Sequence, residues 1–85
     1  PAEAVRRIER EFGLLKDRIA GIRAFEWGTN VSPEKLDQGF THCFVVTFAD
    51  AAARDAYLPH PAHKEFVALL GPHLDKALVV DYLAR

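Results

Sequence analysis

Histidine and tyrosine side chains are the candidates for chemistry in this 85-residue sequence. His42 lies between two phenylalanines, and Tyr57 precedes His60 and His63, which stand three residues apart. Imidazole is the usual general base near neutral pH, and a partly buried tyrosine hydroxyl can donate a hydrogen bond to a developing oxyanion. If helices cover the His42 face of the sheet, we expect His42, Tyr57 and His63 to meet in one partly dry cavity.

The same residues also have structural interpretations. A strand histidine among aromatic residues, such as His42, is more often a hydrogen-bonded core side chain than a catalyst. His60, at the start of a helix, is typical of a capping or solvent-exposed residue. His63 is therefore the first candidate for function.

The sequence lacks the residue patterns that other kinds of site require. Pro61 separates His60 from His63, and no cluster of cysteines or carboxylates completes a transition-metal site. Cys43 points to the opposite face of its strand from His42, so the two cannot act as nucleophile and base. Neither a Gly-x-Ser-x-Gly turn nor a glycine-rich phosphate loop is present. The sequence predicts no metal site and no cofactor.

The composition of the chain also argues against certain kinds of partner and indicates a cellular compartment. Eleven Lys and Arg against twelve Asp and Glu give a net charge of -1, which argues against a nucleic-acid partner. No apolar run approaches the ~20 residues that span a bilayer, so no membrane partner is expected. The lone Cys43 suits the reducing cytoplasm. We expect a single cytoplasmic domain over residues 1–85.

Hydrophobic periodicity predicts the elements that position the candidates. An apolar stripe indicates a first helix, and it comprises Val5, Ile8, Phe12, Leu15 and Ile19. The expected helices cover residues 2–19, 51–58 and 62–70, with a short helical turn after Ser32. The expected strands cover residues 22–27, 40–48 and 76–83.

The two later strands are largely apolar on both faces. An antiparallel sheet in a monomer usually leaves one face to water, and helices cover only one face here. A second copy of the same sheet is the most economical cover for the other face. We therefore expect a homodimer.

Four segments resemble the stress-responsive A/B barrel (Dabb) family. They are WGTNVSPE at 27–34, GFTH at 39–42, DAYLPHPAH at 55–63 and LVVDY at 78–82. The specific part is Tyr-x-x-His-Pro-x-His following a Thr-His strand. The resemblance implies a ferredoxin-like α+β fold, with an antiparallel sheet and helices on one face, that packs sheet to sheet as a dimeric α/β barrel.

The resemblance also implies site roles. Most family members look like small dimers without an assigned reaction, some linked to stress tolerance, and one plant branch is a cofactor-independent polyketide cyclase. Its working tyrosine and histidine fall on Tyr57 and His63, and a pocket histidine falls on His42. His63 would then remove a proton between two carbonyls while Tyr57 holds the thioester carbonyl or the enolate.

Three functions remain open. The first is a small dimeric stress-responsive protein that binds an apolar ligand between helices and sheet. The second is a cofactor-independent enzyme of polyketide-cyclase or monooxygenase type that uses His63 and Tyr57 on a polyketide-like ligand. The third is a purely structural assembly unit. The ligand-binding function and the enzymatic function both need a cavity. The residues that we expect to bind the ligand there are His42, Phe12, Phe44 and His60.

A ferredoxin-like sheet has four strands, and the sequence supplies three. The strand without a counterpart precedes the first helix and is central in this topology. We expect the natural chain to begin with about 8–15 further residues that include a Met and an apolar strand.

Overall fold

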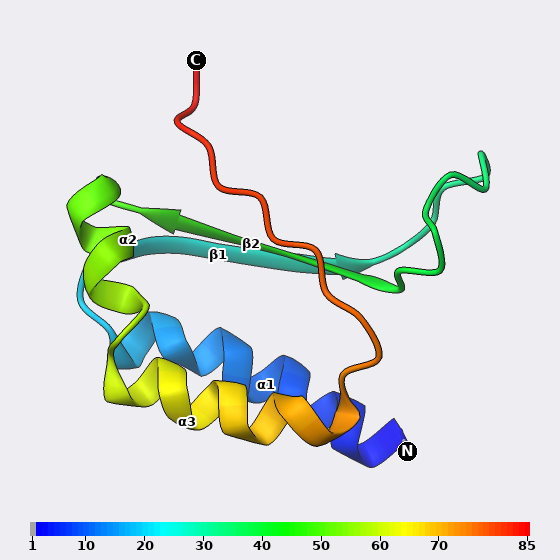
Figure 1. Cartoon of the computed structure of the whole chain (residues 1–85), viewed down its shortest axis with the longest axis horizontal. Coiled ribbons are helices and arrows are strands. Elements are labelled where there is room, and N and C mark those ends of the chain that lie inside the picture. Colours follow the sequence, from blue (N-terminus) through cyan, green and yellow to red (C-terminus); the bar gives the residue numbers. More distant parts are fainter. Residues whose placement is uncertain (1) are drawn as a thin grey trace.

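A computed structural model describes residues 2–85 as two helices packed beneath a two-stranded hairpin (Figure 1). The elements are α1 (Ala2–Arg18), β1 (Ile22–Thr29), β2 (His42–Phe48), α2 (Ala51–Tyr57), α3 (Pro61–Leu70) and a 3-10 turn (Gly71–His73). The three longer predicted helices and the first two predicted strands are confirmed, with ends shifted by one or two residues. α1 and α3 lie side by side on one face of the hairpin, as predicted.

The hairpin is antiparallel, with Phe25 opposite Val46 and Trp27 opposite Phe44. Burial alternates along β2, so that His42 and Phe44 are shielded while Cys43 is exposed. This alternation confirms the predicted faces and turns the aromatic face of the hairpin towards the helices.

The buried core joins both helices to the hairpin. It consists of Ile8, Leu15, Ile19, Ile22, Tyr57, Ala62 and Phe66. Gly13 faces the sheet, and a Cβ atom there would make an ordinary van der Waals contact with the Phe25 ring at 3.6 Å. Gly21 turns the chain from α1 into β1 with φ +97°, and its carbonyl oxygen accepts the Ala49 N–H at 2.9 Å. That bond joins the α1–β1 turn to the β2–α2 turn at one end of the hairpin.

The predicted strand at residues 76–83 is wrong for this structure. Residues 74–85 have no regular secondary structure. From residue 78 onward the large apolar side chains are 71% to 81% exposed, and they are Leu78, Val79, Val80, Tyr82 and Leu83. A strand exists only where a neighbouring strand pairs with its N–H and C=O groups, and no strand within residues 2–85 pairs with this segment.

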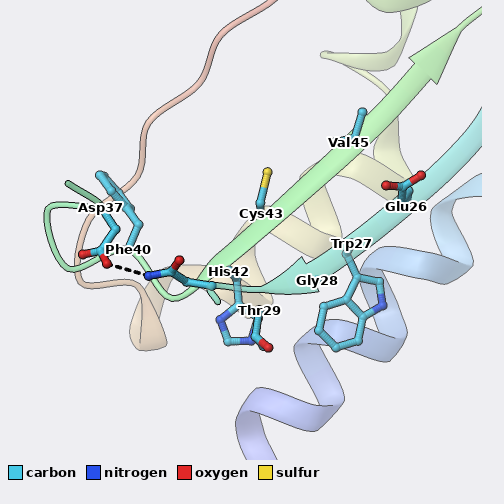
Figure 2. Close-up of a pocket in the computed structure, with 10 residues that line it drawn as sticks. Glu26, Trp27, Gly28, Thr29, Asp37, Phe40, His42, Cys43 and Val45 are labelled. Atoms are coloured by element: carbon cyan, nitrogen blue, oxygen red, sulfur yellow. Dashed lines mark hydrogen bonds between the residues drawn. The ribbon is translucent and has the colours of Figure 1, made fainter. Parts of the chain in front are cut away.

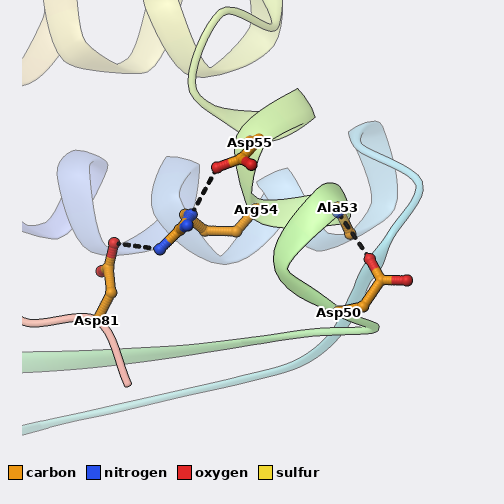
Figure 3. A network of polar contacts seen from close by, with 5 residues as sticks. All are labelled: Asp50, Ala53, Arg54, Asp55 and Asp81. Atoms are coloured by element: carbon orange, nitrogen blue, oxygen red, sulfur yellow. Dashed lines mark hydrogen bonds and ion pairs between the residues drawn. The ribbon is translucent and has the colours of Figure 1, made fainter. Parts of the chain in front are cut away.

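Side chains nevertheless attach this C-terminal segment to the rest of the fold. Arg54 of α2 donates to Asp55 at 2.9 Å and to Asp81 at 3.0 Å, as Figure 3 shows. Lys76 Nζ lies 4.6 Å from the centre of the Phe40 ring, a cation–π distance. The segment therefore lies close to both α2 and the 30–41 loop.

Residues 30–41 form a loop in place of the helical turn expected after Ser32. Asn30 Nδ2 donates to Asp37 at 2.6 Å, and the Asn30 side-chain oxygen accepts the Ser32 N–H at 2.8 Å. Asp37 also accepts the Gly39 N–H at 2.8 Å. The Gly39 bond, followed by the Asn30 bond, holds the pKa of Asp37 below its ordinary value. These local bonds offer the backbone an alternative to a helix.

Candidate functional site

Tyr57 and His63 lie side by side where α2 meets α3. Their ring centroids are 4.2 Å apart. Tyr57 is the last residue of α2, and its ring packs edge-on against Phe48 at 4.9 Å. Pro61 begins α3, and the short break before it turns His63 back towards Tyr57. The sequence predicts that Tyr57 and His63 lie together, and the structure brings them together.

The backbone determines which nitrogen of His63 is free. Nδ1 lies 3.0 Å from the carbonyl oxygen of Leu58. A carbonyl oxygen can only accept, so Nδ1 carries the hydrogen and Nε2 holds the lone pair of the neutral ring. His63 is only partly buried, and it can therefore present Nε2 as a base.

The Tyr57 hydroxyl complements that base as a donor. Burial raises the pKa of Tyr57 above its ordinary value, so the hydroxyl keeps its proton at neutral pH. Within residues 2–85 no fully buried side-chain oxygen or nitrogen lacks a partner, and the Tyr57 hydroxyl makes no side-chain or backbone bond there. Its oxygen is therefore not fully buried, although the Tyr57 residue as a whole is only 8% exposed.

His60 has a structural task in this arrangement. Its Nδ1 accepts the backbone N–H of Ala62 at 3.0 Å and so caps the first turn of α3. The capping interpretation from the sequence is confirmed. A ligand-binding role for His60 stays a prediction.

His42 is separated from the Tyr57–His63 pair. It starts β2, whereas Tyr57 packs on Phe48 at the other end of the strand. Six residues of strand span about 20 Å. The structure brings Tyr57 and His63 together but does not bring His42 into contact with either of them.

Aromatic rings occupy the space between the two ends of β2, where His42 and Phe48 lie. The Phe12 ring lies 4.5 Å from both Phe44 and Phe66 and 5.1 Å from Phe25. Phe12 and Phe44 thus contact each other directly. Their predicted ligand-binding role stays a prediction.

A surface pocket of about 420 Å³ opens at the far end of the hairpin (Figure 2). Its walls are Glu26, Trp27, Gly28, Thr29, Asn30, Asp37, Phe40, His42, Cys43 and Val45. Figure 2 shows Trp27 and His42 on one side of the hairpin, with Cys43 and Val45 on the other. Among the predicted site residues, His42 alone borders this pocket.

Glu9 is a polar partner of His42 that the sequence interpretation missed. Glu9 Oε2 lies 2.8 Å from His42 Nε2, and both side chains are mostly shielded from solvent. Position 9 follows Val5 by four residues and therefore lies beside the apolar stripe of α1. A carboxylate beside that stripe was the signal that could have identified it.

Across residues 2–85, no group of three or more His, Cys, Asp or Glu side chains is arranged to hold a metal ion. No helix in the same part of the chain has the length and apolar character needed to cross a membrane.

The arrangement defines an α+β protein of the ferredoxin-like class, with a tyrosine–histidine pair beside its sheet. The chain belongs to the stress responsive A/B barrel domain (Dabb) family, whose sequence pattern it matches over residues 1–84. It is 41% identical over 80 residues to the Arabidopsis thaliana stress-response A/B barrel domain-containing protein HS1, covering 94% of this chain and 73% of that protein. It is 31% identical over 71 residues to olivetolic acid cyclase from Cannabis sativa, covering 84% and 70%.

Solved structures support the same fold. The Arabidopsis thaliana protein At3g17210 has a TM-score of 0.95 at 39% identity, covering all of this chain and 82% of that one. Hydroxynitrile lyase from Passiflora edulis has a TM-score of 0.93 at 25% identity, covering all of this chain and 81% of that one. A dimeric ferredoxin-like protein from Jannaschia sp. has a TM-score of 0.65 at 31% identity, covering 79% and 68%.

Proposed function

We propose that this domain binds a small carbonyl compound at Tyr57 and His63 and moves a proton on it without a cofactor. The observation behind the proposal is the Leu58 carbonyl on His63 Nδ1, which leaves Nε2 free as a base. The Tyr57 hydroxyl beside it supplies the complementary donor. A positioned base and a positioned donor are the two groups that enolate and alkoxide chemistry requires.

Two relatives support this reaction class over a purely structural role. One is named a cyclase and the other a hydroxynitrile lyase. Release of cyanide from a hydroxynitrile removes the hydroxyl proton as the carbonyl forms. An aldol-type ring closure removes a C–H proton beside a carbonyl. Both steps need a base near the departing proton and a hydrogen bond near the oxygen.

For this chain, His63 Nε2 would take the proton and the Tyr57 hydroxyl would donate to the substrate oxygen as negative charge develops on it. The proton would return from Nε2 to the product or to water. Because Tyr57 stays protonated at neutral pH, it stabilises the charged oxygen more than the neutral ground state. Neither residue needs a metal ion for this role.

The test is turnover of two probes, an aromatic hydroxynitrile and a linear β-keto thioester, by the unmodified chain and by Tyr57→Phe. Loss of one oxyanion donor should lower turnover of the active probe by about 10²–10³-fold. Tyr82→Phe is the matched control, because Tyr82 lies in the C-terminal segment with 76% of its surface exposed.

Equal turnover by Tyr57→Phe and Tyr82→Phe would remove Tyr57 from the mechanism. If the unmodified chain transformed neither probe above the rate in buffer, the enzymatic function would be wrong, and binding of a small apolar ligand would remain to be measured.

We also propose that the domain is a homodimer joined through the outer face of its hairpin. That face is opposite the helices and presents Cys43 and Val45 to solvent. The exposed apolar side chains of the C-terminal segment add to the surface that a partner would cover. One structural neighbour is described as dimeric.

Val45→Asp should raise the dimer dissociation constant by about 100-fold or more, because each copy would place a charge in the shared interface. Analytical ultracentrifugation measures the change. Val67→Asp is the control, since Val67 is a comparably exposed valine on α3. A monomer at all concentrations, or equal weakening by both substitutions, would contradict this interface.

We also propose a biological role and a cellular compartment for this domain. The names of the Arabidopsis relatives support a role in a stress response. The exposed free thiol of Cys43 supports the cytoplasm, where thiols stay reduced.

A further inference from the structure

Three side chains form a hydrogen-bonded relay at the start of β2. Thr41 Oγ1 lies 2.8 Å from His42 Nδ1, and Glu9 Oε2 lies 2.8 Å from His42 Nε2. Glu9 comes from α1, 33 residues away in the chain. The order is hydroxyl, imidazole, carboxylate, and none of these groups belongs to the Tyr57–His63 pair.

The chemistry of the partners sets the direction of the hydrogen bonds. An ionised carboxylate can only accept, so His42 Nε2 carries the ring hydrogen. In the neutral ring Nδ1 then holds the lone pair and accepts the hydrogen of the Thr41 hydroxyl. The Thr41 oxygen is thereby polarised by a base that a third group orients, which is the pattern of an activated nucleophile.

Packing holds the relay in place. The His42 ring stacks with Trp27 at 5.9 Å and with Phe44 at 5.8 Å, with interplanar angles of 14° and 8°. The carbonyl oxygen of Thr41 accepts the Asn30 N–H at 2.9 Å, which fixes the backbone at the exposed end of the relay. Packing alone does not explain a mostly shielded carboxylate at Glu9, because an apolar side chain would avoid its desolvation cost.

We propose that Thr41 is an acyl-accepting nucleophile, with His42 as its general base and Glu9 as the residue that positions His42. The substrate class is a small activated ester or thioester, which would approach the exposed Thr41 hydroxyl from solvent, next to the pocket that Phe40 and His42 line. This second activity does not depend on the proposed function of Tyr57 and His63.

The step balances within the relay and the substrate. Thr41 Oγ1 forms a bond to the acyl carbon while its proton moves to His42 Nδ1. The bond to the leaving oxygen or sulfur then breaks, and that atom takes the proton from Nδ1. Water, activated by the same nitrogen, later attacks the acyl-threonine, so that the free acid and the Thr41 hydroxyl are restored.

The experiment treats the chain with p-nitrophenyl acetate and follows both nitrophenolate release and intact mass. All variants carry Cys43→Ala, because an adjacent thiol would also accept acetyl. We expect one acetyl group mapped to Thr41, with Thr41→Val lowering the acylation rate by about 100-fold and Thr41→Ser retaining it. Glu9→Gln should lower the maximal rate by about tenfold without changing the KM.

Thr47→Val is the matched control, because Thr47 is also an exposed threonine and lies in β2 on the outer face of the hairpin. Circular dichroism shows that each variant is folded. Acetylation that persists at the same rate in Thr41→Val, or that maps only to lysines, would overturn the proposal. So would Glu9→Gln and Thr41→Val variants that unfold more easily yet acylate as fast as Thr47→Val, since the relay would then be structural.

Discussion

Replacing His63 with alanine is expected to lower turnover at the Tyr57–His63 site by about 10²–10⁴-fold. The substitution removes Nε2, the free nitrogen that the Leu58 carbonyl leaves available as a base. Substrate binding should change less, because the Tyr57 hydroxyl remains as a hydrogen-bond donor beside position 63. The measurement is steady-state turnover of whichever probe, hydroxynitrile or β-keto thioester, the unmodified chain transforms.

The matched control is His73→Ala. His73 is an exposed histidine in the 3-10 turn after α3, and no hydrogen bond of its side chain is recorded within residues 2–85. The His63→Ala variant must also keep its helical circular dichroism, since His63 lies in the first turn of α3. Turnover within a factor of two of His73→Ala in a folded His63→Ala variant would show that another group is the base.

The Tyr57–His63 pair could be predicted from the sequence because it is local. The two residues are six positions apart in the sequence, and the Pro59 and Pro61 break between them fixes how the chain turns. The same reasoning predicted the helices and the alternation along β2, since each depends on the spacing of neighbouring residues. Local patterns therefore account for this site and for most of the fold.

The Glu9–His42 contact could not be predicted in that way. It depends on the rotation of α1 over the hairpin, and so on how the rings of Phe12, Phe25 and Phe44 pack between them. The apolar stripe of α1 places Glu9 near the sheet, but no short-range pattern in the sequence specifies which strand residue Glu9 meets. The expectation that His42 would meet Tyr57 failed for the same reason, because it assumed a position along β2 that only the packing decides.

The C-terminal segment shows a different limit of prediction from sequence. Its alternation of apolar residues indicates a strand, yet a strand also needs a neighbour to pair with its backbone. Within residues 2–85 the segment is attached only by side chains such as Arg54 and Lys76. Residue pattern can identify a segment able to form a strand, whereas its pairing depends on the rest of the sheet.

Leu15→Ala is expected to lower the free energy of unfolding by about 2–5 kcal/mol. Leu15 is 1% exposed and is the largest fully buried side chain within residues 2–85. Its truncation leaves a cavity between α1 and the rest of the core, and the lost contacts add to the lost transfer free energy. A domain of this size has a total stability of roughly 4–13 kcal/mol, so the change is a large fraction of it.

Leu14→Ala separates this core effect from the loss of a helical leucine. Leu14 is the adjacent residue of α1 and is 42% exposed, so we expect its truncation to cost less than about 1 kcal/mol. Both variants have the same helix propensity change, which cancels in the comparison. Urea unfolding measures the two free energies, and thermal unfolding should show a midpoint at least about 10 °C lower for Leu15→Ala. Equal costs for the two substitutions would contradict the placement of Leu15 at the centre of the core.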